Sequence, residues 1–198
     1  MPVSPGQERA SGASLPPELR AIMDQLDENE RHARALIAEL DDAQICWQPS
    51  PTAWSIGQCL DHITVANRVY LEPMRRAVAA AQGRGAHRRG PLRPGAPSRW
   101  FVRALEPPPR RRLRAPKQIV PALGKGKAQL ATEFSNEQQG VRDLLLAAAG
   151  LDLNRARFVN PFVPLVRFSV GTGFLVIAAH QRRHLFQAAA VRRHAAFP

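Results

Sequence analysis

Eight prolines lie between residues 84 and 126, and they restrict the possible folds more than any other feature of the sequence. A proline inside a helix removes a backbone hydrogen bond and clashes with the preceding turn. Residues 84–126 are therefore expected to form an irregular connection, in which a helical turn at 98–105 is possible. A structureless connection of this length is unusual in a compact domain and often has a function of its own.

Four stretches outside this connection have apolar residues at the three- and four-residue spacing that is typical of amphipathic helices. The first contains Leu19, Ile22, Met23 and Leu26 on one face. No convincing pair of strands is found, so the sequence predicts an all-α fold. The predicted helices cover residues 17–42, 55–82, 127–149 and 172–195.

Local signals support the boundaries of these helices. Ser55 and Gln58 form a capping box, which satisfies free N–H groups in the first turn of the second helix. Residues 151–171 link the last two helices and are interrupted by prolines. The apolar run 162–168 in this link is expected to pack on the helices.

The chain has 198 residues, of which 44% are apolar, enough for one sizeable core. Residues 15–198 are expected to form a single domain that follows a disordered tail, 1–14. This tail lacks the basic and apolar regions of a secretory signal, and no apolar run is long enough to cross a membrane. Two cysteines, Cys46 and Cys59, are expected to be reduced, which predicts a cytoplasmic protein.

The whole excess of positive charge, +12, lies in one segment. Residues 84–127 contain ten arginines and three lysines against one glutamate, while basic and acidic residues cancel elsewhere. Such a segment could attract phosphate or nucleic acid. However, Trp100 and Phe101 are its only aromatic residues, and binding segments usually use aromatics for stacking. A solvated surface segment with no specific nucleic-acid partner is therefore expected.

Three histidines are candidates for a metal site. His180 and His184 are four residues apart, which places both imidazoles on one face of a helix. This spacing alone is a weak signal, and Gln181 excludes the His-Glu-x-x-His motif of zinc proteases. His62 borders the apolar face of the second predicted helix, where a histidine can be either a ligand or an ordinary boundary residue.

Several segments resemble motifs of the DinB/YfiT-like superfamily. Residues 54–63 (WSIGQCLDHI) resemble its second-helix motif, and residues 180–185 (HQRRHL) resemble its fourth-helix motif. Residues 47–49 (WQP) and 114–116 (RAP) are also similar to the family. The likeness extends over residues 19–191, so it covers nearly the whole chain.

The resemblance implies a DinB-like four-helix bundle with a long Arg- and Pro-rich crossover between the second and third helices. It also implies that His62, His180 and His184 bind one divalent metal ion, Zn²⁺ or Ni²⁺, at one end of the bundle, and that the protein forms homodimers. Three protein ligands leave a coordination position open, as in catalytic rather than structural zinc sites.

The functional hypothesis is a metal-dependent enzyme that activates a small thiol or water, in an S-transferase-like or hydrolase-like reaction. The small-molecule substrate would include a low-molecular-weight thiol, as the family's thiol-dependent members imply. The alternative is a non-catalytic metal- or ligand-binding protein of the stress response on the same fold. The general base is unknown.

Other polar and aromatic residues carry weaker expectations. Cys59 is expected to be a small buried hydrophobe rather than a ligand. Asp61 and Asn67 are candidates to support the ligands, although Asp61 could equally be solvated. Trp54 is expected to be a structural anchor. Tyr70 could line a pocket or pack, and surface positions are expected for three histidines: His32, His87 and His194.

Overall fold

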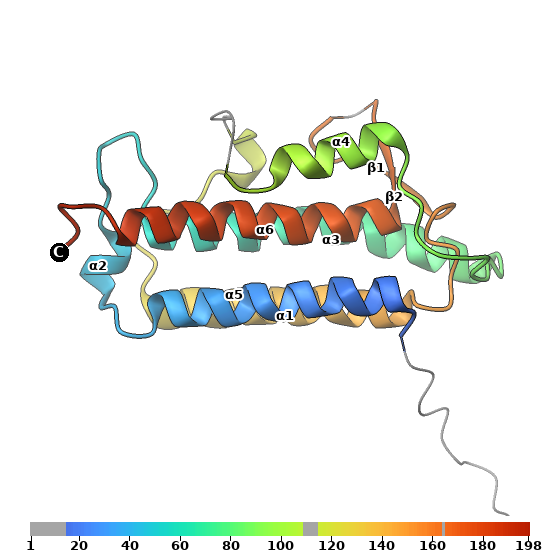
Figure 1. The fold of residues 1–198 in the computed structure, drawn as a ribbon, viewed down its shortest axis with the longest axis horizontal. Coiled ribbons are helices and arrows are strands. Elements are labelled where there is room, and N and C mark those ends of the chain that lie inside the picture. The colour runs from blue at the N-terminus through green and yellow to red at the C-terminus, as the bar shows by residue number, and fades with distance from the viewer. Residues whose placement is uncertain (1–14, 109–114, 164) are drawn as a thin grey trace, which may run out of the picture.

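The structure is a computed structural model that describes residues 15–108, 115–163 and 165–198 (Figure 1). The tail expected over residues 1–14 lies outside the described residues, as does part of the arginine-rich connection.

Four long helices dominate the fold and confirm that it is mostly helical. α3 packs against both α5 and α6, and α1 packs against the same two helices. In Figure 1, α1 and α6 run in one direction and α3 and α5 run in the other. The four are α1 (Pro17–Ile37), α3 (Ile56–Gly83), α5 (Lys127–Ala147) and α6 (Val170–Arg192).

Helix boundaries follow local chemistry where the sequence carries a clear signal. The capping box of Ser55 and Gln58 is present at the start of α3. The prediction that the first helix reaches residue 42 is wrong. α1 ends at Ile37, and a separate short helix, α2 (Asp42–Cys46), begins with its own capping box.

The proline-rich connection joins the end of α3 to the start of α5, two helices that run parallel (Figure 1). It contains α4 (Ala96–Leu105), which packs on α6, and the short 3₁₀ helix η1 (Lys117–Ile119), which packs on α3. The helical turn considered possible at 98–105 is present and belongs to this longer helix. Pro97 lies in the first turn of α4, where a missing N–H costs nothing, so a ten-residue helix forms.

The prediction of no strand pair is also wrong. Residues Arg157–Val159 (β1) and Arg167–Ser169 (β2) form a small antiparallel sheet in which Phe158 faces Phe168. Strands of three residues are too short to show an alternating pattern. The apolar run 162–168 packs only in part, since Leu165 is 98% exposed.

Two hydrophobic clusters fill the interior, and polar side chains lie between them. One cluster includes Leu26, Leu71 and Phe174, and the other includes Ile63 and Leu185. Each long helix supplies buried or half-buried polar residues beside or between its contributions to the two clusters. We call this set the polar layer: Asn29, Glu30, His62, Asn67, Gln138, His180, Gln181 and His184.

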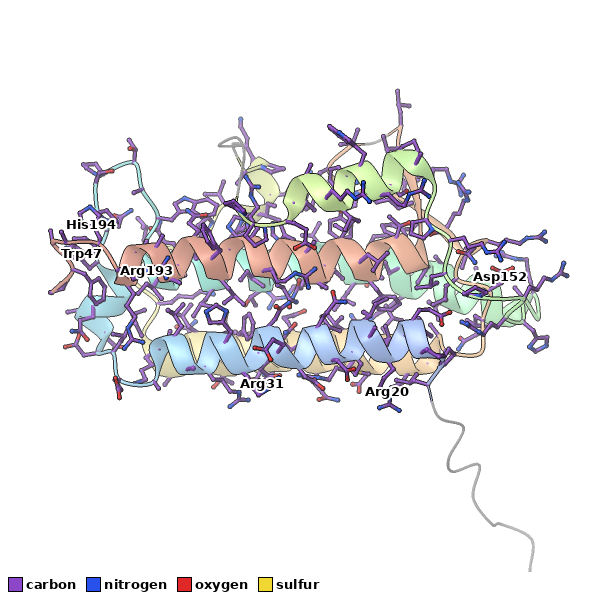
Figure 2. All side chains as sticks on the ribbon, in the orientation of Figure 1. Arg20, Arg31, Trp47, Asp152, Arg193 and His194 are labelled. Atoms are coloured by element: carbon purple, nitrogen blue, oxygen red, sulfur yellow. The ribbon has the colours of Figure 1, made fainter. Side chains whose placement is uncertain are left out.

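Side chains fill the space between the long helices along their length (Figure 2). Asp152 lies at one end of the molecule, and Trp47, Arg193 and His194 lie at the other. None of the helices in the described part of the chain has the length and apolarity needed to cross a bilayer.

Candidate metal centre

Three histidines of the polar layer lie against one another. Their candidate ligand atoms all fall within 4.8 Å of one another, and we call His62, His180 and His184 the imidazole cluster. α3 supplies the first of them and α6 supplies the other two, one helical turn apart. The three residues singled out in the sequence are therefore brought together. They border the hydrophobic cluster that includes Ile63 and Leu185.

The ring of His62 is held in one orientation by the connection that precedes α5. Its Nδ1 lies 2.6 Å from the backbone oxygen of Ile119 in η1. A carbonyl oxygen can only accept, so Nδ1 must carry the proton and Nε2 the lone pair. This lone pair points to the cluster, where Nε2 lies 3.2 Å from Nε2 of His180.

His184 is oriented in a similar way from within its own helix. Its Nδ1 lies 3.1 Å from Oε1 of Gln187, which leaves Nε2 as the unprotonated nitrogen. Its ring centre is 4.4 Å from that of His62 and 4.5 Å from that of His180. Histidine ligands usually donate their second ring N–H to an oxygen in this manner, which fixes both tautomer and ring direction.

Aromatic packing shields one side of the cluster. The Trp54 ring lies 4.7 Å from the His62 ring and 5.7 Å from the His184 ring, measured between centroids. Trp54 therefore packs on the imidazoles as well as on the hydrophobic cluster beside them. His180 is the most accessible of the three because it is half-buried, whereas His62 and His184 are buried.

Burial keeps the three imidazoles neutral. It lowers the pKa of His62, although the Ile119 carbonyl and Asp61 act in the opposite direction. It also lowers the pKa of His184 to about 3, and repulsion from His62 and Arg183 adds to this effect. The pKa of His180 lies well below its ordinary value, first because of burial and then because of its imidazole neighbours. Neutral imidazole is the form that binds metal ions.

The geometry of the cluster fits a divalent metal ion. Two nitrogens that each lie about 2.0–2.1 Å from a tetrahedral zinc are about 3.3 Å apart. The distance of 3.2 Å between Nε2 of His62 and Nε2 of His180 is close to this value. Three nitrogen donors without a thiolate or carboxylate suit Zn²⁺, Ni²⁺, Co²⁺ and Fe²⁺ alike, so the donor set alone does not select the metal.

Asp61 holds the connection over the cluster. Its carboxylate accepts hydrogen bonds from the backbone N–H of Ala122 and from Nζ of Lys125, each at 2.7 Å. Lys125 also forms an ion pair with Glu133 of α5 at 2.6 Å. Asp61 is only 2% exposed, so the alternative that its side chain is solvated is wrong. Adjacent residues of α3, Asp61 and His62, thus bind the same stretch of the connection.

The remaining candidates lie outside the cluster. Cys59 is fully buried in the hydrophobic core, and burial raises the pKa of its thiol, as expected of a small hydrophobe. Asn67 is buried, but its Nδ2 finds no hydrogen-bond partner among the described residues. Tyr70 packs on Phe158 and Phe162. Surface positions are confirmed for His32, His87 and His194.

A second group in the polar layer could not be predicted from the sequence. Asn29, Gln138 and Gln181 form what we call the amide cluster, which links α1, α5 and α6. Gln181 donates to Gln138 at 2.6 Å and accepts from it at 3.1 Å. Glutamines have no characteristic spacing, so only the packing of distant helices could reveal this group.

The fold and the imidazole cluster together define a mostly helical protein that is compatible with metal binding. The family model of the DinB superfamily matches residues 25–188, and the chain belongs to this superfamily. The resemblance seen in the sequence is thereby confirmed. No curated protein and no solved structure shows significant similarity to the chain.

Proposed function

We propose that this chain is a DinB-like four-helix bundle that binds one divalent metal ion, Zn²⁺ or Ni²⁺, through His62, His180 and His184. The observation that carries the proposal is the convergence of three neutral imidazoles. Two of these have their Nδ1 atoms engaged by oxygens and so direct Nε2 to a common point.

We further propose that the site activates a small thiol or water in an S-transferase-like or hydrolase-like reaction. A bound metal would supply a nucleophile near neutral pH by lowering the pKa of that group. The chain's own residues would hold the site in place. Ile119 and Gln187 fix the ring tautomers, Trp54 excludes water from one side, and half-buried His180 marks the side open to a ligand.

One observation favours the alternative of a non-catalytic metal- or ligand-binding stress protein. Two hollows stand out on the described part of the molecule, and the imidazole cluster lines neither of them. An enzyme needs room for a substrate beside the metal. We include in the leading proposal a small-molecule substrate, no specific nucleic-acid partner and a homodimer in the cytoplasm, as the sequence and the family resemblance imply.

Metal content tests the proposal. The purified protein should contain about one divalent metal ion per chain, and replacing any ligand with alanine should remove it. His62→Ala and His184→Ala should lose metal to the same extent as His180→Ala. His32→Ala is the matched control, because His32 is exposed on α1 and should keep its metal. Equal metal in wild type and His180→Ala would contradict the assignment of the site.

A thermal-shift screen of small thiols on the metal-loaded protein separates the two functions. A thiol that stabilises the wild type and fails to stabilise His180→Ala supports the enzyme that uses a thiol. No stabilisation by any thiol, together with retained metal, favours the water-activating or the non-catalytic alternative.

A further inference from the structure

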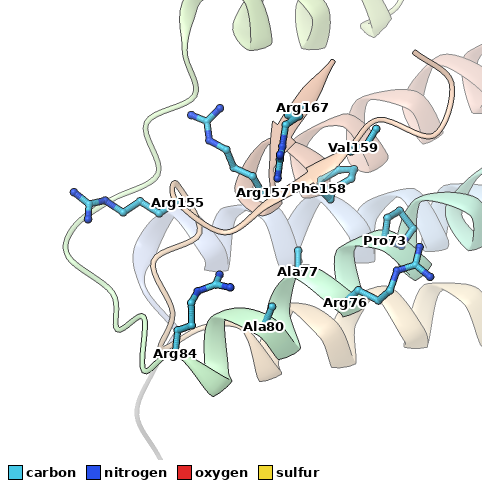
Figure 3. A pocket seen from close by; sticks show the side chains of 10 residues that line it. All are labelled: Pro73, Arg76, Ala77, Ala80, Arg84, Arg155, Arg157, Phe158, Val159 and Arg167. Carbon is cyan, nitrogen blue, oxygen red and sulfur yellow. The ribbon is translucent and has the colours of Figure 1, made fainter. Parts of the chain in front are cut away.

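A wide hollow of about 520 Å³ lies between the last turns of α3 and the β-hairpin, well away from the imidazole cluster (Figure 3). Pro73 is the lining residue of α3 nearest to His62 and lies 11 positions after it, which corresponds to about 17 Å along the helix axis. The size of this hollow falls within the range of small-molecule sites, about 300–1,000 Å³.

Five arginines and no acidic residue line the hollow. They come from α3 and the residue that follows it, from the link before β1 and from both strands: Arg76, Arg84, Arg155, Arg157 and Arg167. Figure 3 shows Arg84 extending from the end of α3 towards the hairpin. Four of the five lie outside the basic segment 84–127, so a count of charge along the sequence does not reveal them.

Little negative charge compensates this group. Arg76 pairs with exposed Glu72 on its own helix, and Arg155 lies 3.7 Å from Asp152. Arg84, Arg157 and Arg167 form no ion pair or side-chain hydrogen bond with the described residues. Arg157 and Arg167 are also diagonal neighbours on the hairpin, where like charges repel.

The floor of the hollow is apolar and is set by small side chains. Ala77 and Ala80 lie on the same face of α3 as Arg76 and Arg84, and Phe158 closes the side formed by the hairpin. Larger residues at the alanine positions would fill the space between the arginines. The lining therefore combines hydrogen-bond donors of one charge with an apolar surface.

We propose that this hollow binds a small organic phosphate monoester, with the phosphate on the arginines and the organic group on the alanine floor. Guanidinium groups bind phosphate oxygens through two parallel hydrogen bonds, and a dianion can engage two such groups at once. A carboxylate with one negative charge satisfies only one of them. The site is distinct from the imidazole cluster and does not depend on the metal proposal.

Isothermal titration calorimetry with phenyl phosphate tests this site on the full chain, in about 0.15 M salt so that non-specific attraction is screened. Phenyl phosphate should bind about tenfold more tightly than benzoate, which lacks the second charge, and more tightly than inorganic phosphate, which lacks the apolar group. Equal binding of phenyl phosphate and benzoate, or no binding of phenyl phosphate, would overturn the proposal.

Variants locate the binding. Arg84→Gln and Arg157→Gln should each weaken the binding of phenyl phosphate about tenfold. Arg193→Gln removes the same charge at the other end of the molecule, beside Trp47 and His194 in Figure 2, and should bind as the wild type does. An equal loss in Arg193→Gln would show that overall charge alone attracts the ligand.

Ala80→Glu provides a variant that should fold whether or not the proposal is correct. Ala80 is exposed, and a glutamate there lies four residues from both Arg76 and Arg84, a spacing that favours ion pairs on a helix. The new carboxylate should occupy the place of the phosphate and abolish binding. Undiminished binding of phenyl phosphate by folded Ala80→Glu would place the ligand elsewhere.

Discussion

The amide cluster and the imidazole cluster are neighbours in the polar layer, and they differ in how far their side chains pair with one another. Gln138 and Gln181 exchange two hydrogen bonds, and Asn29 donates to Gln181 and to the Ala178 carbonyl. In the imidazole cluster, by contrast, one hydrogen bond of 3.2 Å joins Nε2 of His62 and Nε2 of His180, and the Nδ1 atoms of His62 and His184 are engaged by oxygens outside the cluster.

This difference separates a structural polar group from a binding site. Buried polar atoms need partners, since leaving one unpaired costs about 1–3 kcal/mol. The amides find these partners in each other and need no ligand. The imidazoles instead direct their free nitrogens inward, where a cation can serve all three at once.

The largest expected effect on stability comes from breaking the amide cluster. Gln138→Leu leaves Nε2 of Gln181 without its acceptor in a fully buried place, and should lower the free energy of unfolding by about 1–3 kcal/mol. Metal content should not change, because α5 supplies no imidazole. Urea denaturation and elemental analysis of the same sample check both parts.

The double variant Gln138→Leu with Gln181→Leu sharpens the test. Replacing both partners with apolar groups should recover most of the lost stability, because fewer polar atoms are then left unpaired. Losses that simply add in the double variant would show that the two amides act independently.

A smaller effect is expected from the groups that orient the ligands. Gln187→Leu removes the acceptor for Nδ1 of His184 and should weaken metal binding by about 10–100-fold without abolishing it. Competition with a metal chelator measures this change. Ala190→Leu is the matched control, because Ala190 is exposed on the same helix and should not affect the affinity. Unchanged affinity in Gln187→Leu would remove this residue from the site.

The smallest effect on stability is expected from Glu30, the charged residue of the polar layer. Burial would raise the pKa of Glu30, but hydrogen bonds from Arg34, Arg142 and Ser135 outweigh burial and hold the pKa below its ordinary value. The charged form of Glu30 therefore stabilises the fold at neutral pH. This contribution should be lost as the pH falls through the ordinary glutamate value of about 4.3 and then through the lower value in the fold.

Glu30→Gln measures this contribution. The wild type should be more stable by about 1 kcal/mol at pH 7, and the difference should shrink below about pH 4. Unfolding in urea at several pH values checks this prediction. A difference that is constant with pH would show that the charge of Glu30 is not what stabilises the fold.

The sequence predicted the long helices well because their apolar spacing extends over many turns, as in Leu19, Ile22, Met23 and Leu26. It missed the hairpin because strands of three residues carry no pattern. It extended the first helix too far because Leu40 continues the apolar spacing of Leu36 and Ile37 beyond the end of α1. The three histidines were found from helix spacing and from the family resemblance together. Spacing alone left His62 undecided, since its partners lie more than a hundred residues away.

The sequence could not predict the contacts that the proline-rich connection 84–126 makes with the site. Proline content indicated an irregular segment, but not that the Ile119 carbonyl would orient His62 or that Asp61 would hold Ala122 and Lys125 beside it. A backbone carbonyl has no sequence signal. The same holds for the arginine-lined hollow, whose residues gather only when the hairpin packs on α3.

X-ray absorption at the metal edge tests the central claim most directly, because it counts the imidazoles around the ion. The wild type should show three imidazole nitrogens at about 2.0–2.1 Å if the metal is zinc, and His62→Ala should lose the metal and this signal with it. A spectrum of the wild type without imidazole scattering, or one that is unchanged in His62→Ala, would contradict the account.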